Sequence, residues 1–219
     1  MASGARWVMT TVTRMSTDLL RLTQWLSPAF PVSGYAYSHG LEAAMEAGRV
    51  HDAASCRDWA AAVLRFGTGA LDAWVIRAAM RGEDPADLAD LVRARAGCAE
   101  RWEETRAMGA AFCEVTTGMG EPPLADLPLP VALGLRARGM EAGVVVTLYL
   151  QSFAGQIVSA ATRFLPLGQT EAQRVLREMH PVIEEVAAAT SDDPPGSAAM
   201  LAEIDAIRHE TLQPRIFRT

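Results

Sequence analysis

The most apolar stretch of the chain is Glu141–Arg163, with the sequence EAGVVVTLYLQSFAGQIVSAATR. Its large apolar residues surround a helical axis on most sides, and they are Val144, Val145, Val146, Leu148, Tyr149, Leu150, Phe153, Ile157 and Val158. A helix with this pattern is usually central and buried. No apolar run of the chain approaches the length expected to span a bilayer. The sequence therefore predicts a core helix around which other helices pack.

Helical patterns also occur on both sides of this stretch. They cover Asp18–Trp25, Ser38–Ala47, Ser55–Ala79, Pro85–Ala94, Ala96–Thr117 and Leu129–Arg136. Ser55 and Asp84 are the expected N-caps of the third and fourth of these helices, and Gly67 and Gly69 predict a kink in the third. A further helix is capped by Thr170 and bent or split at Pro181, and a last helix runs from Ser197 past Asp205. Neither strand alternation nor a long internal repeat is present. We predict an all-α, single-domain bundle of roughly eight to ten helices.

The chain length of 219 residues fits one domain with a substantial core. We predict a flexible N-terminal tail at residues 1–17, an all-α domain at residues 18–207 and a C-terminal partner-binding tail at residues 208–219. The first 17 residues lack a basic region followed by an apolar run, so we expect no signal peptide. Cys56, Cys98 and Cys113 are odd in number and widely spaced, as in reduced cytoplasmic proteins.

The charged residues exclude several classes of function. The net charge of −6 argues against nucleic acid or an anionic membrane as a partner. All 20 basic residues are arginine, so the chain has no lysine for a phosphate-binding P-loop, a Schiff base or a general base. If GTP is used in the pathway, another protein must hydrolyse it.

Residues 25–42, WLSPAFPVSGYAYSHGLE, are too irregular for a plain helix. Pro28 and Pro31 each fix φ and remove a backbone donor. The aromatic residues after Trp25 are costly to leave in water, so the segment should fold back onto the body and stay rigid. An aromatic, largely uncharged and stiff segment is typical of a recognition element.

Three further blocks accompany this segment: WEETRAMG at residues 102–109, RFLPLGQT at residues 163–170 and RHETLQPRIFRT at residues 208–219. In this order, the four blocks resemble motifs of the UreF family of urease accessory proteins, and the resemblance covers essentially the whole chain. Three positions depart from the family pattern: Ser33 replaces a usual Gly, Tyr35 a frequent Phe, and Thr219 a Ser. Ser33 would be strained if its position required a positive φ.

The resemblance implies a cytoplasmic, all-α and non-catalytic maturation factor without a cofactor of its own. Such a protein forms a homodimer and binds UreD, also called UreH, and then the GTPase UreG. The assembly docks on apo-urease (UreABC) and helps to insert nickel. In this view the chain couples GTP hydrolysis to nickel delivery, and by family analogy it lines a path for Ni²⁺.

Motif matching places the UreD contact in the C-terminal tail, at Arg208, Arg215, Ile216, Phe217 and Arg218. Arginine beside aromatic and aliphatic anchors is typical of interface hot spots and is poor material for solvated disorder. The alternative is a tail folded onto its own domain, and the two interpretations can coexist. We expect a tail that is mobile alone and that orders on a partner.

In residues 25–42, Tyr37, His39 and Glu42 are candidates for the GTPase or nickel-transfer surface. A structural role fits them equally well, because Tyr and His are commonly half-buried. Residues 166–170 serve either as an interhelical connection or as a partner contact. Arg163 either caps the preceding helix or pairs with a partner carboxylate.

Two other classes of function remain as alternatives. The first is a small helical metal- or ligand-binding enzyme that uses His39 and Glu42, and the second is a regulatory module unrelated to urease. However, His209 and Glu210 lack the second His of a zincin motif, and Ser33 does not lie in a nucleophile elbow. The histidines and cysteines match no ligand spacing, so we predict no catalytic residue and no metal site within one subunit. A transient metal site, or one formed by residues of two symmetry-related subunits, remains an alternative.

Overall fold

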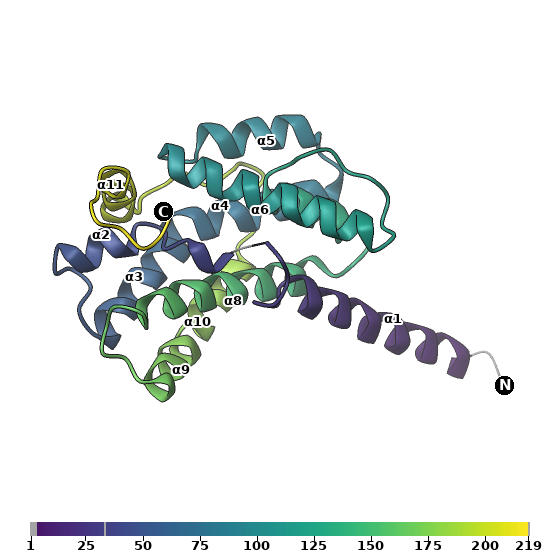
Figure 1. The fold of residues 1–219 in the computed structure, drawn as a ribbon. Coiled ribbons are helices and arrows are strands. Elements are labelled where there is room, and N and C mark those ends of the chain that lie inside the picture. Colours follow the sequence, from purple (N-terminus) through teal and green to yellow (C-terminus); the bar gives the residue numbers. More distant parts are fainter. Residues whose placement is uncertain (1–3, 33, 219) are drawn as a thin grey trace.

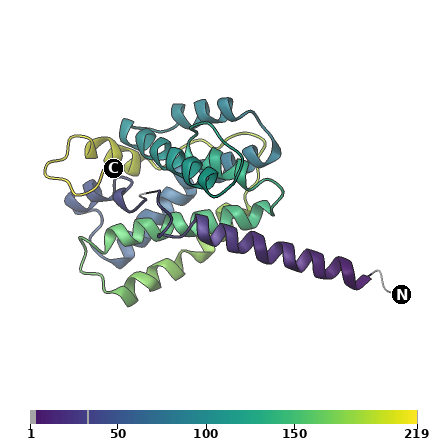
Figure 2. The ribbon, with the colours of Figure 1, turned by 45° about the vertical axis from the view of Figure 1, so that its right-hand side comes forward.

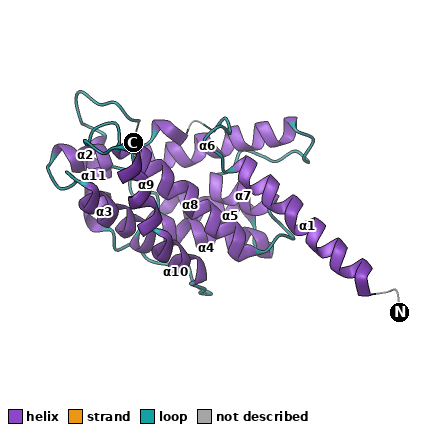
Figure 3. Ribbon diagram, turned by 90° about the horizontal axis from the view of Figure 1, so that it is seen from below, coloured by secondary structure: helices purple, strands orange, loops and turns teal. Residues whose placement is uncertain are grey.

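The computed structural model describes residues 4–32 and 34–218, and this part contains helices and no strand (Figure 1, Figure 3). The helices are α1 (Gly4–Trp25), the 3-10 helix η1 (Gly34–Ala36), α2 (Leu41–Glu46), α3 (Ala53–Phe66), α4 (Thr68–Arg81), α5 (Pro85–Ala94), α6 (Ala99–Gly118), α7 (Leu129–Arg136), α8 (Ala142–Ala161), α9 (Gln169–Glu178), α10 (His180–Ala188) and α11 (Met200–His209). The prediction of a single all-α domain is confirmed. The α-helices slightly exceed the predicted number because the 55–79 pattern divides into α3 and α4.

Local signals explain most of the helix boundaries. Asp84 caps α5 as predicted, since its Oδ1 accepts a hydrogen bond of 2.8 Å from the Ala86 N–H. Asp52, rather than Ser55, caps α3, and Ser55 completes a capping box with it. Thr170 lies inside α9, whose N-cap is Gly168. The predicted split at Pro181 is confirmed, because α9 ends at Glu178 and Pro181 lies in the first turn of α10.

Helix α8 lies at the centre of the bundle, as its sequence predicts (Figure 1). It contacts α1, α2, α3, α4, α9 and α10, and residues such as Leu150, Ile157 and Val145 are fully buried. The prediction that no segment reaches membrane-spanning length is wrong, because α8 has the length and composition to cross a bilayer. In this structure, however, other helices of the bundle cover more than half of it.

Helix α1 is longer than the sequence pattern suggests. It begins at Gly4 rather than Asp18 and projects away from the bundle (Figure 2). Among its described side chains, Leu22 and Trp25 at the C-terminal end are buried in the core. Residues 4–17, which were predicted to form a flexible tail, are therefore helical. The flexibility of the segment stays a prediction.

Candidate functional site

The segment 25–42 folds back onto the bundle, as its aromatic residues predict. The rings of Trp25 and Phe30 each lie 5.8 Å from the ring of Phe112 in α6, and Tyr37 is buried. Ser33 and the side chain of Tyr35 lie outside the described residues, so the expectation of strain at Ser33 is not tested. The segment ends in α2, which carries Glu42 in its first turn.

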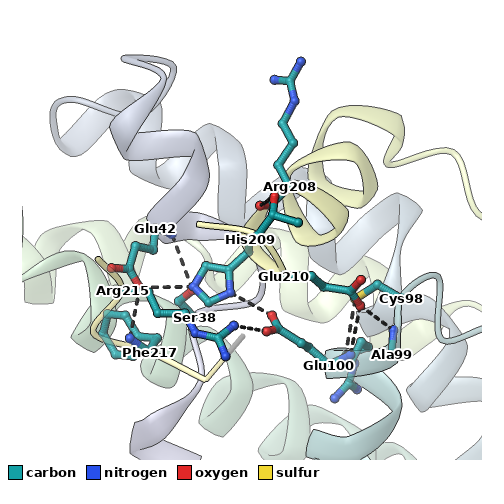
Figure 4. A network of polar contacts seen from close by, with 12 residues as sticks. Ser38, Glu42, Cys98, Ala99, Glu100, Arg208, His209, Glu210, Arg215 and Phe217 are labelled. Atoms are coloured by element: carbon teal, nitrogen blue, oxygen red, sulfur yellow. Dashed lines mark hydrogen bonds and ion pairs between the residues drawn. The ribbon is translucent and has the colours of Figure 1, made fainter. Parts of the chain in front are cut away.

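Glu42 attaches the C-terminal tail to this segment (Figure 4). Its buried carboxylate accepts hydrogen bonds from the backbone N–H groups of Ile216, at 2.8 Å, and Phe217, at 2.9 Å. The same carboxylate lies 3.1 Å from Nε2 of His209, the last residue of α11. One side chain of the N-terminal segment thus fixes two parts of the C-terminal region.

The opposite side of His209 faces the start of α6. Nδ1 of His209 lies 2.7 Å from Oε2 of Glu100, and the Arg215 guanidinium also binds the Glu100 carboxylate. Glu210 accepts hydrogen bonds from the N–H groups of Ala99, at 2.7 Å, and Glu100, at 3.3 Å, where a carboxylate is favoured by the helix dipole. We call Glu42, Glu100, His209 and Arg215, with the backbone of Ile216 and Phe217, the tail junction.

The last tail residues divide between the core and the surface. Phe217 is 2% exposed, with its ring 5.6 Å from that of Phe164, and the Arg163 guanidinium lies 5.1 Å from the Phe217 ring. Arg163 therefore stacks on the tail. The Arg218 N–H donates to the Ala36 carbonyl at 2.8 Å, while the Arg218 side chain is exposed. Ile216 is 68% exposed.

The tail is thus folded onto its own domain, which was one of the two interpretations of its sequence. Arg208 and Ile216 remain available to a partner, whereas Phe217 is covered by its own chain. Its expected mobility in the absence of a partner stays a prediction. The contact of the tail with a partner also stays a prediction.

His39 is buried, and its ring lies beside Glu104 of α6 and Phe153 of α8. Its backbone has a φ of 56°, in the left-handed region, and its ring packs edge-on against Phe153 at 4.4 Å. Nε2 lies 3.3 Å from Oε1 of Glu104, but neither ring nitrogen has a hydrogen bond of good geometry within the described residues. Burial, assisted by the positive charge of Arg101, lowers the pKa of His39 well below its usual value. The imidazole is therefore neutral.

The structure does not bring His39 and Glu42 together as a catalytic pair. His39 faces Glu104, whereas the Glu42 carboxylate is occupied by the tail and by His209. The enzyme alternative, which relies on these two residues acting together, therefore gains no support from the geometry. In addition, no group of three or more His, Cys, Asp or Glu suited to a metal ion is found in the part of the chain that the structure describes.

Sequence reasoning missed a buried ionic network next to His39. Arg101 in α6 binds Asp72 in α4 at 3.1 Å and Glu104 at 3.3 Å, and the Tyr149 hydroxyl donates to Asp72 at 2.5 Å. Both carboxylates are 1% exposed. Burial raises the pKa of Asp72 and, together with the Asp72 charge, raises that of Tyr149 well above its usual value. The only available signal was an acidic residue, Asp72, within an apolar helical pattern.

Two small cavities flank His39 and Arg101, which line both of them. Their volumes are about 40 and about 70 Å³. Polar side chains line the first cavity, including Thr105, whose hydroxyl is buried without a hydrogen-bond partner in the described structure. Cavities of this size have room for a few water molecules rather than for an organic substrate.

The outer face of α11 is a second feature that sequence reasoning missed. It exposes four large apolar side chains, Met200, Leu201, Ile204 and Ile207, whereas Asp205 and His209 on the same helix are buried. The spacing of 200, 204 and 207 was a helical signal in the sequence. We call these four residues the α11 face.

Comparisons with known proteins agree with the sequence resemblance. The UreF family model matches residues 50–180. The chain is 51% identical over 210 residues to the urease accessory protein UreF of Cereibacter sphaeroides strain KD131, covering 94% of this chain and all of that protein. It is 51% identical over 207 residues to UreF of Jannaschia sp. strain CCS1, with coverages of 92% and 94%. For UreF of Roseobacter denitrificans the identity is 41% over 213 residues, with coverages of 94% and 96%.

Proposed function

The chain belongs to the UreF family of urease accessory proteins, which implies a role in urease maturation, and from this premise we propose that it is a non-catalytic scaffold. It bridges UreD/UreH and the GTPase UreG on apo-urease in the cytoplasm, works as a homodimer, and couples GTP hydrolysis to nickel delivery. The relatives named above are accessory proteins, and the chain has no lysine for phosphate chemistry of its own.

The observation that carries this proposal is the exposed surface at the C-terminal end of the chain. The α11 face is apolar, Arg208 on the same helix is exposed, and Arg215 and Arg218 are exposed in the tail that follows it, although the protein as a whole has a net charge of −6. Exposed apolar residues with arginine at their edges are typical of protein interfaces. We assign this surface to UreD/UreH, with acidic groups of the partner facing the arginines.

Residues 25–42 support the GTPase and nickel-transfer side of the proposal indirectly. Tyr37 and His39 are buried, so they would act by holding the shape of this region rather than by presenting their side chains. Nickel enters the proposal as cargo.

We expect the double variant Ile204→Glu/Ile207→Glu to lose binding to the cognate UreD-like protein. Two carboxylates in the centre of an apolar contact would be desolvated, and hot-spot losses of about 2 kcal/mol or more correspond to roughly thirtyfold weaker binding. Co-purification followed by titration of the two purified proteins measures the loss. Both side chains are substantially exposed, so the variant should fold normally.

The matched control is Met119→Glu, which places a carboxylate at another exposed apolar position, just after α6. It should bind like the wild-type chain. If the double variant bound with wild-type affinity and had unchanged helix content, the α11 face would not be part of the partner contact. A truncated chain that ends at Ala206 then tests whether the tail alone carries the contact.

A further inference from the structure

Helix α1 exposes apolar side chains along one of its sides. Met15 is 62% exposed and Leu19 is 39% exposed, whereas Leu22 is buried where the helix enters the bundle. The sequence continues the same alternating spacing of four and three residues at Val12 and Val8. This is the spacing with which one helix packs against another helix. We call these five positions the α1 seam.

Helix α8, although central, leaves one of its sides open. Val144 and Ser159 are exposed, and Leu148, Gln151 and Gly155 between them are half-buried. We call these five residues the α8 stripe. A Cβ atom added at Gly155 would meet no neighbour within 4 Å in the described structure, so another helix can approach α8 closely there.

The α1 seam and the α8 stripe form one continuous surface. Met15 and Val144 both line an open pocket of about 450 Å³, and Leu148 and Gly155 line a second one of about 570 Å³. Leu22 lines both pockets and so connects them. Because α1 projects away from the bundle, its N-terminal part extends beyond the α8 of its own chain (Figure 2).

We propose that this surface is the contact between two copies of the chain, in which α1 of each copy lies along the α8 stripe of the other. The inference rests on the homodimer of the proposed function and assigns its interface. A twofold pair uses the same patch on both subunits, so the patch must be complementary to itself. Here it combines a projecting apolar helix with open apolar pockets that can receive one.

The composition of the surface favours a second copy over a different partner. Helix α8 has no charged residue, and among the residues that line the two pockets only Asp18 and Glu141 are charged. The Glu141 carboxylate is already bound to the N–H groups at the start of α8. Homodimer interfaces are more apolar than those of transient complexes. The surface assigned to UreD/UreH differs from this one, because exposed arginines accompany its apolar residues.

The size of the surface also fits a specific dimer. Residues 4–21 of α1 and residues 144–159 of α8 each provide a helix face about 25 Å long, at a rise of about 1.5 Å per residue. With a width of about 10 Å, the two faces of one copy cover roughly 500 Å². A symmetrical pair then buries on the order of 1,000 Å², which is enough for a specific interface.

Sedimentation equilibrium of the full-length chain tests the proposal. The wild-type chain should be a dimer, and Gly155→Glu should raise the dimer dissociation constant at least about thirtyfold, because a carboxylate would be desolvated inside an apolar contact. The open space around Gly155 allows the variant to fold, which circular dichroism checks. The matched control is Gly196→Glu in the linker before α11, where an added Cβ atom also meets nothing within 4 Å. It should dimerise like the wild-type chain.

A second pair of variants tests the part played by α1. Met15→Glu changes the α1 seam and should weaken the dimer to a similar extent. Leu20→Glu changes a residue that is 70% exposed but lies off the seam, and it should leave the dimer unchanged. Loss of the dimer in Gly155→Glu but not in Met15→Glu would overturn the exchange of α1 between the copies.

Failure of this inference can be distinguished from failure of the proposed function. If the wild-type chain were a dimer and both Gly155→Glu and Met15→Glu kept its dissociation constant, the interface proposed here would be wrong and the homodimer would stand. A monomeric wild-type chain would overturn both the interface and the homodimer. Neither result depends on UreD/UreH, whose contact is tested at the α11 face.

Discussion

Replacement of Arg101 by methionine is expected to destabilise the fold by about 3–5 kcal/mol, the usual cost of removing one partner from a buried ion pair. The variant leaves Asp72 and Glu104 inside the protein without their shared counter-charge. Methionine retains much of the apolar stem, so the loss reports on the charge rather than on a large cavity. Urea unfolding followed by circular dichroism measures the free energy of unfolding.

A matched control lies on the same helix. Arg106 pairs with Glu103 at the surface, and Arg106→Met should change the free energy of unfolding little, because exposed ion pairs contribute little.

The Arg101 variant should also recover stability as pH falls. Burial already raises the pKa of Asp72 while Arg101 opposes it, so without Arg101 the folded state takes up a proton more readily. Equal losses in the two variants would show that the network is not a structural requirement.

The Arg101 network shows why part of this site could not be predicted from the sequence. Asp72, Arg101 and Tyr149 come from three different helices, and spacing along the chain does not reveal which buried charges meet. The same holds for the tail junction, where 167 positions separate Glu42 from His209. The sequence pattern presents His209 only as half of a zincin motif, since its two carboxylate partners are distant in sequence.

Local chemistry, in contrast, predicted most of the helices. The pair Asp84 and Pro85 determines the start of α5, and the apolar residues of α8 predicted its central position. The sequence did not predict where two of the helices begin. Thr170 is a good capping residue by type, yet α9 begins at Gln169, and α1 continues well before Asp18 through a stretch rich in threonine and methionine.

Gly40, within residues 25–42, lies directly against α11. Its replacement is expected to cause the second large loss in the free energy of unfolding. Its φ is 78°, and a Cβ atom there would lie 2.7 Å from the backbone nitrogen of Ala206 in α11. Gly40→Ala therefore adds left-handed backbone strain of about 1–2 kcal/mol. It also forces α2 and α11 apart, and overpacking costs about 1–3 kcal/mol more. Urea unfolding should show a total loss of about 2–5 kcal/mol.

Gly48 provides a control that separates the two causes. It has a φ of 70°, but nothing lies within 4 Å of a Cβ atom added there, so Gly48→Ala should show the strain alone. Displacement of α11 also moves His209 away from Glu42, so the Ile216 and Phe217 amides should lose protection in Gly40→Ala but not in Gly48→Ala. If both variants lost the same stability and kept the tail protected, the contact between Gly40 and α11 would not position the tail. A loss of amide protection in Gly40→Ala alone would instead show that residues 25–42 and the tail form one structural unit. The hydrogen bonds from the tail to Glu42 lead us to expect this result.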